Sequence, residues 1–268
     1  MNGDKLKSMI SKLKLSTFAS HHQDIAIEAE REGWSFGQYL YQLCEMEISV
    51  RQTKRIDRIS KQSELPQSKT LNTFDTGPLP EKIKRQLPTL CEGNFVDKAH
   101  NLIVFGLPGR GKTHLLCAIG HCLVKKGVPI LFIPAFKLVQ RLLVAKQELR
   151  LEKELKRLDK YEAVIIDDIG YIQQGRDEME VLFTFLAERY ERKSVMISSN
   201  LVFSQWDRIF KDAMTTAAAV DRLVHHSIIL EMNQESYRTK KAKESIETRN
   251  KNSDETKNIV LTNAGADC

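Results

Sequence analysis

The segment from Gly106 to Thr113, GLPGRGKT, has the residue types and spacing of a phosphate-binding loop, GxxxxGK[ST]. Glycines let backbone N–H groups approach phosphates, and a helix that starts directly after such a loop adds partial positive charge. We expect Lys112 to reach the β- and γ-phosphates and the Thr113 hydroxyl to ligate Mg²⁺. The predicted ATP site comprises Gly106, Leu107, Pro108, Gly109, Arg110, Gly111, Lys112, Thr113 and His114. An ordinary glycine-rich turn is disfavoured, because an apolar run precedes the loop and a helical stretch follows it.

Two adjacent carboxylates, Asp167 and Asp168, end the apolar run AVIIDD. Neighbouring side chains on a strand point in different directions, so the two can have separate roles. We expect Asp167 to hold Mg²⁺ through water and Asp168, where glutamate is frequent, to polarise the attacking water. The alternative is a strand that simply ends in a polar turn, since Ile169 and Gly170 follow. A phosphate-binding loop upstream favours the catalytic interpretation.

Asn200 follows another buried-type run, Ser194–Ser199. It could cap a helix that begins near Phe203. In phosphate-loop ATPases with an extra strand between the loop strand and the carboxylate strand, a polar residue here lies between γ-phosphate and water. The expected strand order favours this second interpretation.

Short apolar runs alternate with helical patterns along the middle of the chain, which predicts an α/β fold with a parallel five-stranded sheet flanked by helices. The expected strands are 101–105, 128–133, 163–167, 194–199 and 227–230. A Ser-, Pro- and Thr-rich stretch, 63–80, is interpreted as a linker into a core at 81–238. The polar tail at 239–268 is predicted to be disordered.

Residues 1–62 show helical patterns and no strand signal, which predicts a small all-helical N-terminal module. A first amphipathic segment runs from Ser20 to Arg31 and ends at Gly33. Ser35 and Gln38 resemble a capping box that opens a long helix. The C-terminal half of that helix carries a basic stripe, which we define as Arg51, Lys54, Arg55, Arg58 and Lys61. This stripe is either a solvated helix face or a surface that contacts DNA phosphates.

Composition limits the classes of partner and compartment. A net charge of +6 and a pI near 9.0 favour a polyanionic partner. Five scattered cysteines lack metal or disulfide spacing, and no run of eighteen apolar residues occurs, so we expect a reduced, cytoplasmic protein without a membrane partner. The adjacent His225 and His226 have no third ligand at metal spacing, and we interpret them as structural histidines.

Several motifs together resemble the IstB-like transposition helper ATPases, relatives of bacterial helicase loaders in the AAA+ initiator group. They are GLPGRGKTHL, VIIDDIGY, FLAERYERKSVMISSNLVFSQW, VDRLVHHSIIL and ESYR, with EREGWSFGQYLYQL and KTLNTFD upstream. The resemblance covers roughly residues 12–240. It implies an AAA+ core that assembles into a ring or helical array with ATP between subunits. On that basis Asn200 is sensor 1, Arg222 is an arginine finger reaching a neighbour's ATP, and Arg238 resembles sensor 2.

Two positions depart from the family pattern. Arg110 stands where the family usually has a small residue, although this loop position is permissive. After Tyr171 the family typically shows a proline-containing turn, whereas this chain has Ile172-Gln-Gln-Gly-Arg176. The contacts of that loop are therefore not carried over from the family.

Three functions compete at this stage. The leading hypothesis is a transposition helper that assembles on duplex DNA with little sequence preference, hydrolyses ATP and recruits its cognate transposase; the absence of a base-reading motif favours backbone contacts. The second is a replicative helicase loader with the same ATPase core. The third, a small-molecule kinase, would need an arginine-rich lid, and none precedes Asn200.

Overall fold

The computed structural model describes residues 3–171, 175–206, 209 and 213–233. By its internal contacts the chain divides into two compact units, which are described separately. Unit 1 is residues 1–62 with the turn 125–127, and unit 2 is residues 63–124 and 128–268. Within the described ranges, no helix is both long and apolar enough to span a bilayer. The predicted tail, 239–268, and Arg238 lie outside the described residues, as do positions 172–174 of the divergent loop.

Unit 1 contains three helices, α1 (Gly3–Lys12), α2 (Ser16–Glu32) and α3 (Phe36–Gln62). Gly33 ends α2 in the left-handed conformation, at φ 67°, as the sequence suggested. The capping box before α3 is confirmed, because the Ser35 amide donates to Gln38 Oε1 (2.8 Å) and the Gln38 amide to Ser35 Oγ (3.2 Å). The expected start of α2 at Ser20 is four residues late, since Ser16 opens the helix.

A buried carboxylate holds the helices of unit 1 together. Glu47 on α3 is 4% exposed and accepts a hydrogen bond from the Thr17 amide at 2.8 Å. Arg51 Nε donates to the same carboxylate at 2.6 Å, and Arg51 Nη2 donates to the Lys14 carbonyl at 2.6 Å. Burial alone would raise the pKa of Glu47, but the hydrogen bonds from Thr17 and Arg51 outweigh it and lower that pKa. Arg51 therefore has a structural partner within unit 1.

Unit 2 is built around the sheet. The elements after α3 are η1 (Leu71–Thr73), α4 (Glu81–Glu92), α5 (Asn94–Asp97), β1 (Asn101–Phe105), α6 (Lys112–Lys125), β2 (Ile130–Pro134), α7 (Ala135–Gln147), α8 (Leu151–Leu158), β3 (Ala163–Asp167), η2 (Ile169–Tyr171), α9 (Arg176–Arg189), β4 (Ser194–Ser199), η3 (Phe203–Gln205), α11 (Ala213–His225) and β5 (Ser227–Glu231). The five strands correspond to the predicted runs; β1, β3 and β4 have the predicted bounds, β2 covers 130–134 instead of 128–133, and β5 ends at Glu231 instead of Leu230. The Val128 amide donates to the Leu123 carbonyl at the end of α6 and so belongs to the turn.

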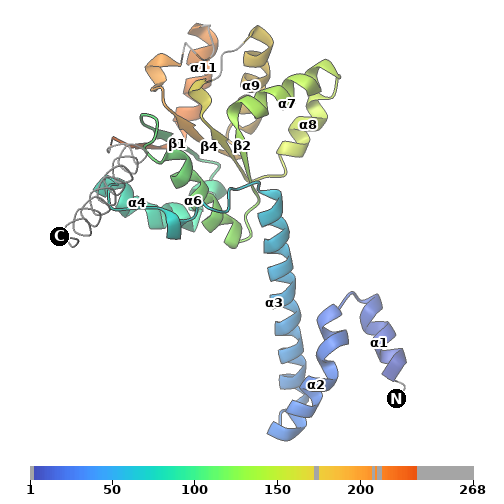
Figure 1. The fold of residues 1–268 in the computed structure, drawn as a ribbon. Coiled ribbons are helices and arrows are strands. Elements are labelled where there is room, and N and C mark those ends of the chain that lie inside the picture. Colours follow the sequence, from blue (N-terminus) through green and yellow to red (C-terminus); the bar gives the residue numbers. More distant parts are fainter. Residues whose placement is uncertain (1–2, 172–174, 207–208, 210–212, 234–268) are drawn as a thin grey trace, which may run out of the picture. The chain divides into compact units, whose positions relative to one another are not determined.

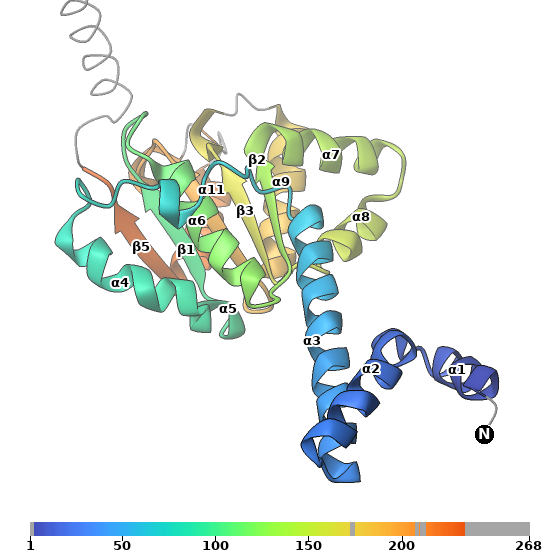
Figure 2. The same cartoon turned by 60° about the horizontal axis from the view of Figure 1, so that its bottom comes forward.

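The five strands are all parallel, in the order β2-β3-β4-β1-β5. Helices α7, α9 and α11 cover one face, and α4 and α6 lie on the other (Figures 1 and 2). Strand residues alternate between the two layers: Ile103 and Ile197 belong to the cluster with α7 and α9, whereas Ile165 lies close to Gly120 of α6. Strands β1 to β4 are buried on both faces, which explains the mainly apolar sequences of β1 to β3; β4 also buries three serines.

A buried arginine fixes the edge where β3 and β4 begin. Arg189 is 3% exposed, and its guanidinium donates to the carbonyls of Leu158, Tyr161, Glu162 and Ser194. Burial lowers the pKa of Arg189 to about 10. The guanidinium hydrogen-bonds main-chain carbonyls at the α8–β3 connection and at the start of β4, so we assign Arg189 a structural role that sequence reasoning did not find.

Candidate nucleotide-binding site

The predicted site residues meet at the carboxyl-terminal edge of the sheet. The phosphate-binding loop follows β1, the two aspartates end β3, and Asn200 follows β4. Strand β4 pairs with both β1 and β3 and therefore separates the loop strand from the carboxylate strand. This is the extra-strand order that was expected. Ligands of open parallel sheets bind outside this edge.

The loop backbone has the conformation that its glycines allow. Gly109 and Gly111 have φ angles of 79° and 87°, in the left-handed region that side-chain-bearing residues rarely adopt. Helix α6 begins at Lys112, so its free N–H groups face the loop. Lys112 is 5% exposed, and its ammonium donates to the Leu107 carbonyl at 3.1 Å. A phosphate oxygen can replace this carbonyl as acceptor, which gives an anion site at the start of α6.

A hydroxyl and carboxylate network joins the loop to the ends of β3 and β4. Thr113 Oγ1 donates to Asp167 Oδ1 at 2.7 Å, and Ser198 Oγ donates to the same oxygen at 2.6 Å. The Asp168 amide donates to Ser198 Oγ at 2.8 Å, and Asp168 has a positive φ of 57°. The geometry thus brings together the two residues predicted as metal ligands, Thr113 and Asp167. Ser198, which sequence reasoning missed, links the two aspartates.

The Asn200 side chain packs against Gly170, in the segment that follows Asp167 and Asp168. A Cβ atom on Gly170 would collide with Asn200 Oδ1, so glycine is required there for this packing. Asn200 Oδ1 is buried and accepts no hydrogen bond from the described residues. The helix-capping interpretation is not supported, because the residue before η3 is Val202 and no side chain caps that turn.

Residues of the 63–80 segment pack against the start of α6. His114 Nε2 lies 3.1 Å from the Thr70 carbonyl and 3.2 Å from Thr73 Oγ1, and its ring is 4.9 Å from that of Phe74. Burial and the nearby charge of Lys69 lower the pKa of His114, although its hydrogen bond to the Thr70 carbonyl acts in the opposite direction. These contacts join the linker to the start of α6 through His114.

Arg110, which stands where the family usually has a small residue, contacts the chain beyond β5. Its Nη1 donates to the Asn233 carbonyl at 2.7 Å, just beyond β5. The phosphate-binding loop is thereby tied to the segment that leads towards Arg238, which itself lies outside the described residues.

The predicted arginine finger, Arg222, is placed on α11 against α9. Its guanidinium lies over the Phe183 ring at 4.7 Å from the centroid, and its Nη1 is buried without a hydrogen-bond partner among the described residues. The described hydrogen bonds and ion pairs connect Arg222 to none of the loop residues, and its role as an arginine finger stays a prediction.

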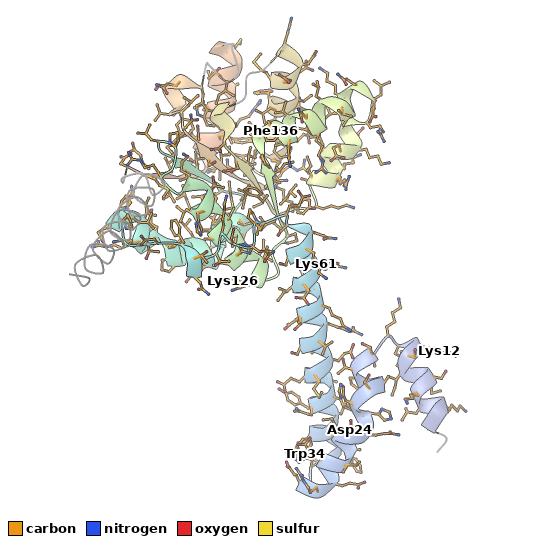
Figure 3. All side chains as sticks on the ribbon, in the orientation of Figure 1. Lys12, Asp24, Trp34, Lys61, Lys126 and Phe136 are labelled. Carbon is orange, nitrogen blue, oxygen red and sulfur yellow. The ribbon has the colours of Figure 1, made fainter. Side chains whose placement is uncertain are left out.

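The basic stripe lies on α3 and is exposed throughout. Figure 3 shows the side chains along this helix, with Lys61 labelled near its C-terminal end. Arg51 binds Glu47, and Arg55 Nη2 lies 3.5 Å from the Gly127 carbonyl. Lys54, Arg58 and Lys61 form no ion pair within the described ranges. These three are therefore the members of the stripe available for an external anion.

Comparisons with known proteins agree with this geometry. The family model described as "IstB-like ATP binding protein" matches residues 8–245. The chain is 41% identical to a putative insertion sequence ATP-binding protein of Sinorhizobium fredii, over 90% of this chain and 81% of that protein. It is 36% identical to the insertion sequence IS21 putative ATP-binding protein of Pseudomonas aeruginosa, over 92% and 93% respectively.

Solved structures show the same fold at low identity. AMPPCP-bound DnaA from Aquifex aeolicus aligns with a TM-score of 0.54 at 19% identity, covering 70% of this chain and 57% of that one. This chain thus spans little more than half the length of that DnaA. The DnaC helicase loader aligns with a TM-score of 0.50 at 23% identity, covering 62% and 97%. With a DnaA-like AAA+ fold and a family match over nearly its whole length, the chain belongs to the IstB-like ATP-binding proteins of insertion sequences.

Proposed function

We propose that this protein hydrolyses ATP with Mg²⁺ while assembled on duplex DNA, and that it assists a cognate transposase of its insertion sequence in target selection or recruitment. The observation that carries the ATPase part is the network of Thr113, Asp167 and Ser198 beside the buried ammonium of Lys112. This arrangement puts a phosphate-binding cation and two oxygen ligands at one edge of the sheet.

The donor set fits a magnesium ion. Mg²⁺ prefers oxygen ligands and binds with few protein groups, keeping waters and phosphate oxygens. The Thr113 hydroxyl and the Asp167 carboxylate, 2.7 Å apart, are such groups. When bound, the ion would offset the negative charge of the β- and γ-phosphates. The Ser198 hydroxyl would then orient the Asp167 carboxylate towards it.

The remaining polar groups have separate tasks. Asp168 follows Asp167 directly and has a positive φ of 57°, and we assign its carboxylate to polarise the attacking water. The Asn200 side chain is assigned to position that water or the γ-phosphate. We expect Asp168→Asn to bind ATP and stay on DNA without hydrolysing it; hydrolysis at the unmodified rate would reject Asp168 as the base.

The proposed role of Arg222 makes ATP hydrolysis depend on assembly of the subunits. An arginine supplied by a neighbouring subunit stabilises charge in the transferring phosphoryl group and is worth about 10³–10⁵-fold in rate. We therefore expect Arg222→Ala to bind ATP but not hydrolyse it. Mixing it with subunits that carry an intact Arg222 and the Lys112→Ala change should restore activity. No restoration at any mixing ratio would contradict an intersubunit finger and with it this reason for a ring or helical array.

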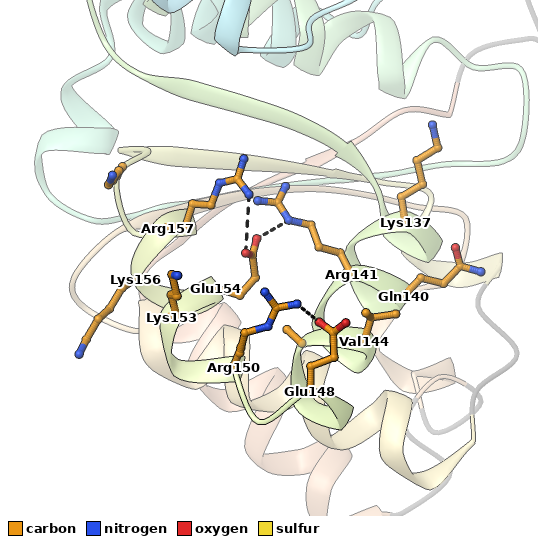
Figure 4. A pocket seen from close by; sticks show the side chains of 12 residues that line it. Lys137, Gln140, Arg141, Val144, Glu148, Arg150, Lys153, Glu154, Lys156 and Arg157 are labelled. Atoms are coloured by element: carbon orange, nitrogen blue, oxygen red, sulfur yellow. Dashed lines mark hydrogen bonds and ion pairs between the residues drawn. The ribbon is translucent and has the colours of Figure 1, made fainter.

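Unit 2 has a basic surface of its own, which is a second candidate for DNA contact besides the α3 stripe. A hollow between α7 and α8 has twelve lining residues, of which seven are basic and two acidic (Figure 4). The acids are already paired: Glu154 with Arg141 and Arg157, and Glu148 with Arg150. Of the four remaining basic residues, Lys156 pairs with Glu152 outside the hollow. The other three, Lys137, Lys153 and Lys160, form no ion pair with any described residue, and we call them the α7–α8 lysines. They leave this surface positive and accessible to phosphates.

Matched triple alanine variants test the two surfaces. One removes Lys54, Arg58 and Lys61 of the stripe, and one removes the α7–α8 lysines. The control removes Lys82, Arg85 and Lys98, which are exposed near α4 and α5. If all three cations of a surface contact phosphates, the slope of log K against log salt should fall by about 2.7, from about 0.9 per phosphate.

Duplexes of different sequence should lose affinity equally, because phosphate contacts carry no base information. Each surface is judged against the control. A surface whose variant keeps the slope of the control does not bind DNA. If neither test variant differs from the control, the proposed duplex contact is wrong in both places.

The most direct test of the whole proposal is ATP hydrolysis and assembly size, measured with and without duplex DNA. We expect hydrolysis and larger assemblies to rise together when DNA is added, and Lys112→Ala to abolish hydrolysis. A helicase loader is the alternative with the same fold. Binding to the transposase encoded beside the gene supports the transposition role, whereas binding to the replicative helicase in its place would favour the loader.

A further inference from the structure

A cluster of ligand-type side chains lies at the sheet edge opposite the nucleotide site. His225 and His226 end α11 and lead into β5, and Glu191 lies in the turn between α9 and β4. Because β4, β1 and β5 are parallel neighbours in the sheet, their amino-terminal ends meet at one edge. The sequence showed no third ligand beside the two histidines. The fold supplies one, from a segment more than thirty residues away.

The three candidate ligand atoms face one another. Glu191 Oε1 lies 3.5 Å from His226 Nε2 and 3.9 Å from His225 Nδ1, and all three atoms lie within 4.8 Å of one another. Tetrahedral coordination with bonds of about 2.0–2.1 Å puts neighbouring ligand atoms about 3.3–3.4 Å apart. The two Glu191 distances need changes of about 0.1–0.6 Å, and the two histidine nitrogens must approach each other by at most about 1.4 Å, which rotation of partly exposed side chains allows.

Buried contacts hold the two segments in place. The side chain of Asn101, the first residue of β1, donates to the Leu223 carbonyl of α11 (3.0 Å) and accepts from the Val195 amide of β4 (3.0 Å). The His226 ring stacks on His100 with a centroid distance of 5.4 Å and an interplanar angle of 4°. The main chains that carry the cluster are thus positioned by contacts independent of any ion.

We propose that Glu191, His225 and His226 bind a divalent transition-metal ion of the zinc class. Two imidazoles and one carboxylate are a ligand set of intermediate softness, which suits Zn²⁺, Co²⁺ or Ni²⁺ and not Mg²⁺, whose preferred ligands are all oxygen. Three protein ligands leave a fourth position for water. The hydroxyl of Tyr190, 3.0 Å from His225 Nδ1, must turn away when that nitrogen binds the ion. A bound ion would link the end of α11, the helix that carries Arg222, to the turn that follows α9.

The experiment uses the full-length chain without an affinity tag, stripped of metal by a chelator and free of nucleotide. The exposed Cys44 is replaced by serine in all samples, because thiolates also bind zinc. Zn²⁺ is titrated by calorimetry, and Co²⁺ binding is followed by its visible absorption. We expect one equivalent of Zn²⁺ to bind, with the intense absorption of tetrahedral Co²⁺ and a higher Tm in the presence of zinc.

His226→Gln and Glu191→Gln should each weaken Zn²⁺ binding at least about tenfold, since each removes a ligand. The matched control is the double change His21→Gln with His22→Gln, which removes the other adjacent histidine pair and should leave binding unchanged. Lys112→Ala should also keep the zinc signal, so this result is independent of the ATPase proposal. Equal Zn²⁺ affinity in the wild type, His226→Gln and Glu191→Gln would overturn the site, as would a failure of the wild type to bind Zn²⁺.

Discussion

Ser198→Ala tests whether the network behind the metal ligands matters for ATP binding. The Ser198 hydroxyl is fully buried, donates to Asp167 Oδ1 at 2.6 Å and accepts from the Asp168 amide at 2.8 Å. Alanine removes both hydrogen bonds and leaves the strand otherwise unchanged. The Thr113 contact to Asp167 remains. The variant therefore loosens the carboxylate without removing a proposed ligand.

Two magnitudes follow from these contacts. A hydrogen bond to a charged group contributes about 1.5–3 kcal/mol, and a buried amide without its acceptor costs about 1–3 kcal/mol. The Asp168 amide bond is only partly buried, so we take the lower ends of both ranges and expect a loss of about 3 kcal/mol in unfolding free energy. For a domain of this size that lowers Tm by about 6–12 °C. Loss of a group that orients a metal ligand typically weakens metal binding by about 10–100-fold. The Mg²⁺-dependent part of ATP affinity should fall by that factor.

The assay measures ATP affinity with Mg²⁺ and with EDTA, together with Tm. Ser199→Ala is the matched control: Ser199 is equally buried, and its hydroxyl donates to the Leu201 carbonyl (2.7 Å) and accepts from the Leu201 amide (3.0 Å). Both variants should lose stability, but only Ser198→Ala should lose the gain in ATP affinity that Mg²⁺ gives. If Ser198→Ala keeps that gain, or Ser199→Ala loses it equally, the assigned role of Ser198 is refuted.

Three further perturbations test other contacts. Gly170→Ala forces the Asn200 side chain aside, so ATP hydrolysis should fall about 100-fold while ATP binding persists; unchanged hydrolysis would remove Asn200 from the mechanism. Arg189→Met leaves four main-chain acceptors without their donor and should cost about 3–5 kcal/mol, measured by urea unfolding, whereas a loss under 1 kcal/mol would contradict the structural role. The pKa of His114 in the folded state lies below 6.5, so at acidic pH the folded chain binds fewer protons than the unfolded chain. The contribution of His114 to stability is therefore complete above pH 6.5 and decreases as the pH falls below 6.5. His114→Gln should therefore lose less Tm than the wild type between pH 7.5 and 5.5, and an equal loss would refute this assignment.

The sequence predicted those parts of the fold that depend on local pattern. The phosphate-binding loop is a contiguous motif, and β1, β2 and β3 are mainly apolar runs because a parallel sheet covered on both faces requires them. The capping box at Ser35 and Gln38 is likewise a contact between near neighbours. Such features need only a few residues in a fixed spacing, which is why they were found without a structure.

The features that were missed depend on pairing between distant segments. Ser198 and Ser199 look alike in sequence, and only the register, in which Ile166 pairs with Ile197, puts Ser198 beside Asp167. In the sequence Glu47 looks like an exposed helix residue, but in the fold it accepts a hydrogen bond from the Thr17 amide. Glu191 meets the histidine pair only because three strands start at the same edge. Helical periodicity and motif spacing carry no information about these contacts.

The position of β4 explains why the network has these members. Adjacent strands lie about 4.8 Å apart, so inserting β4 between β1 and β3 separates the loop strand from the carboxylate strand by about 9.6 Å. In the proposed site, the terminal phosphates, an ion and a water would lie between Lys112 and Asp168. The gap requires the residues at the end of β4 to occupy the middle of the site. Ser198 is one such residue, because its hydroxyl donates to Asp167 on the neighbouring strand. Asn200, two residues further along the chain, is another, because it presents its side-chain amide there. A sheet with β1 next to β3 would have no position for either residue, so the strand order itself determines which side chains can act on the nucleotide.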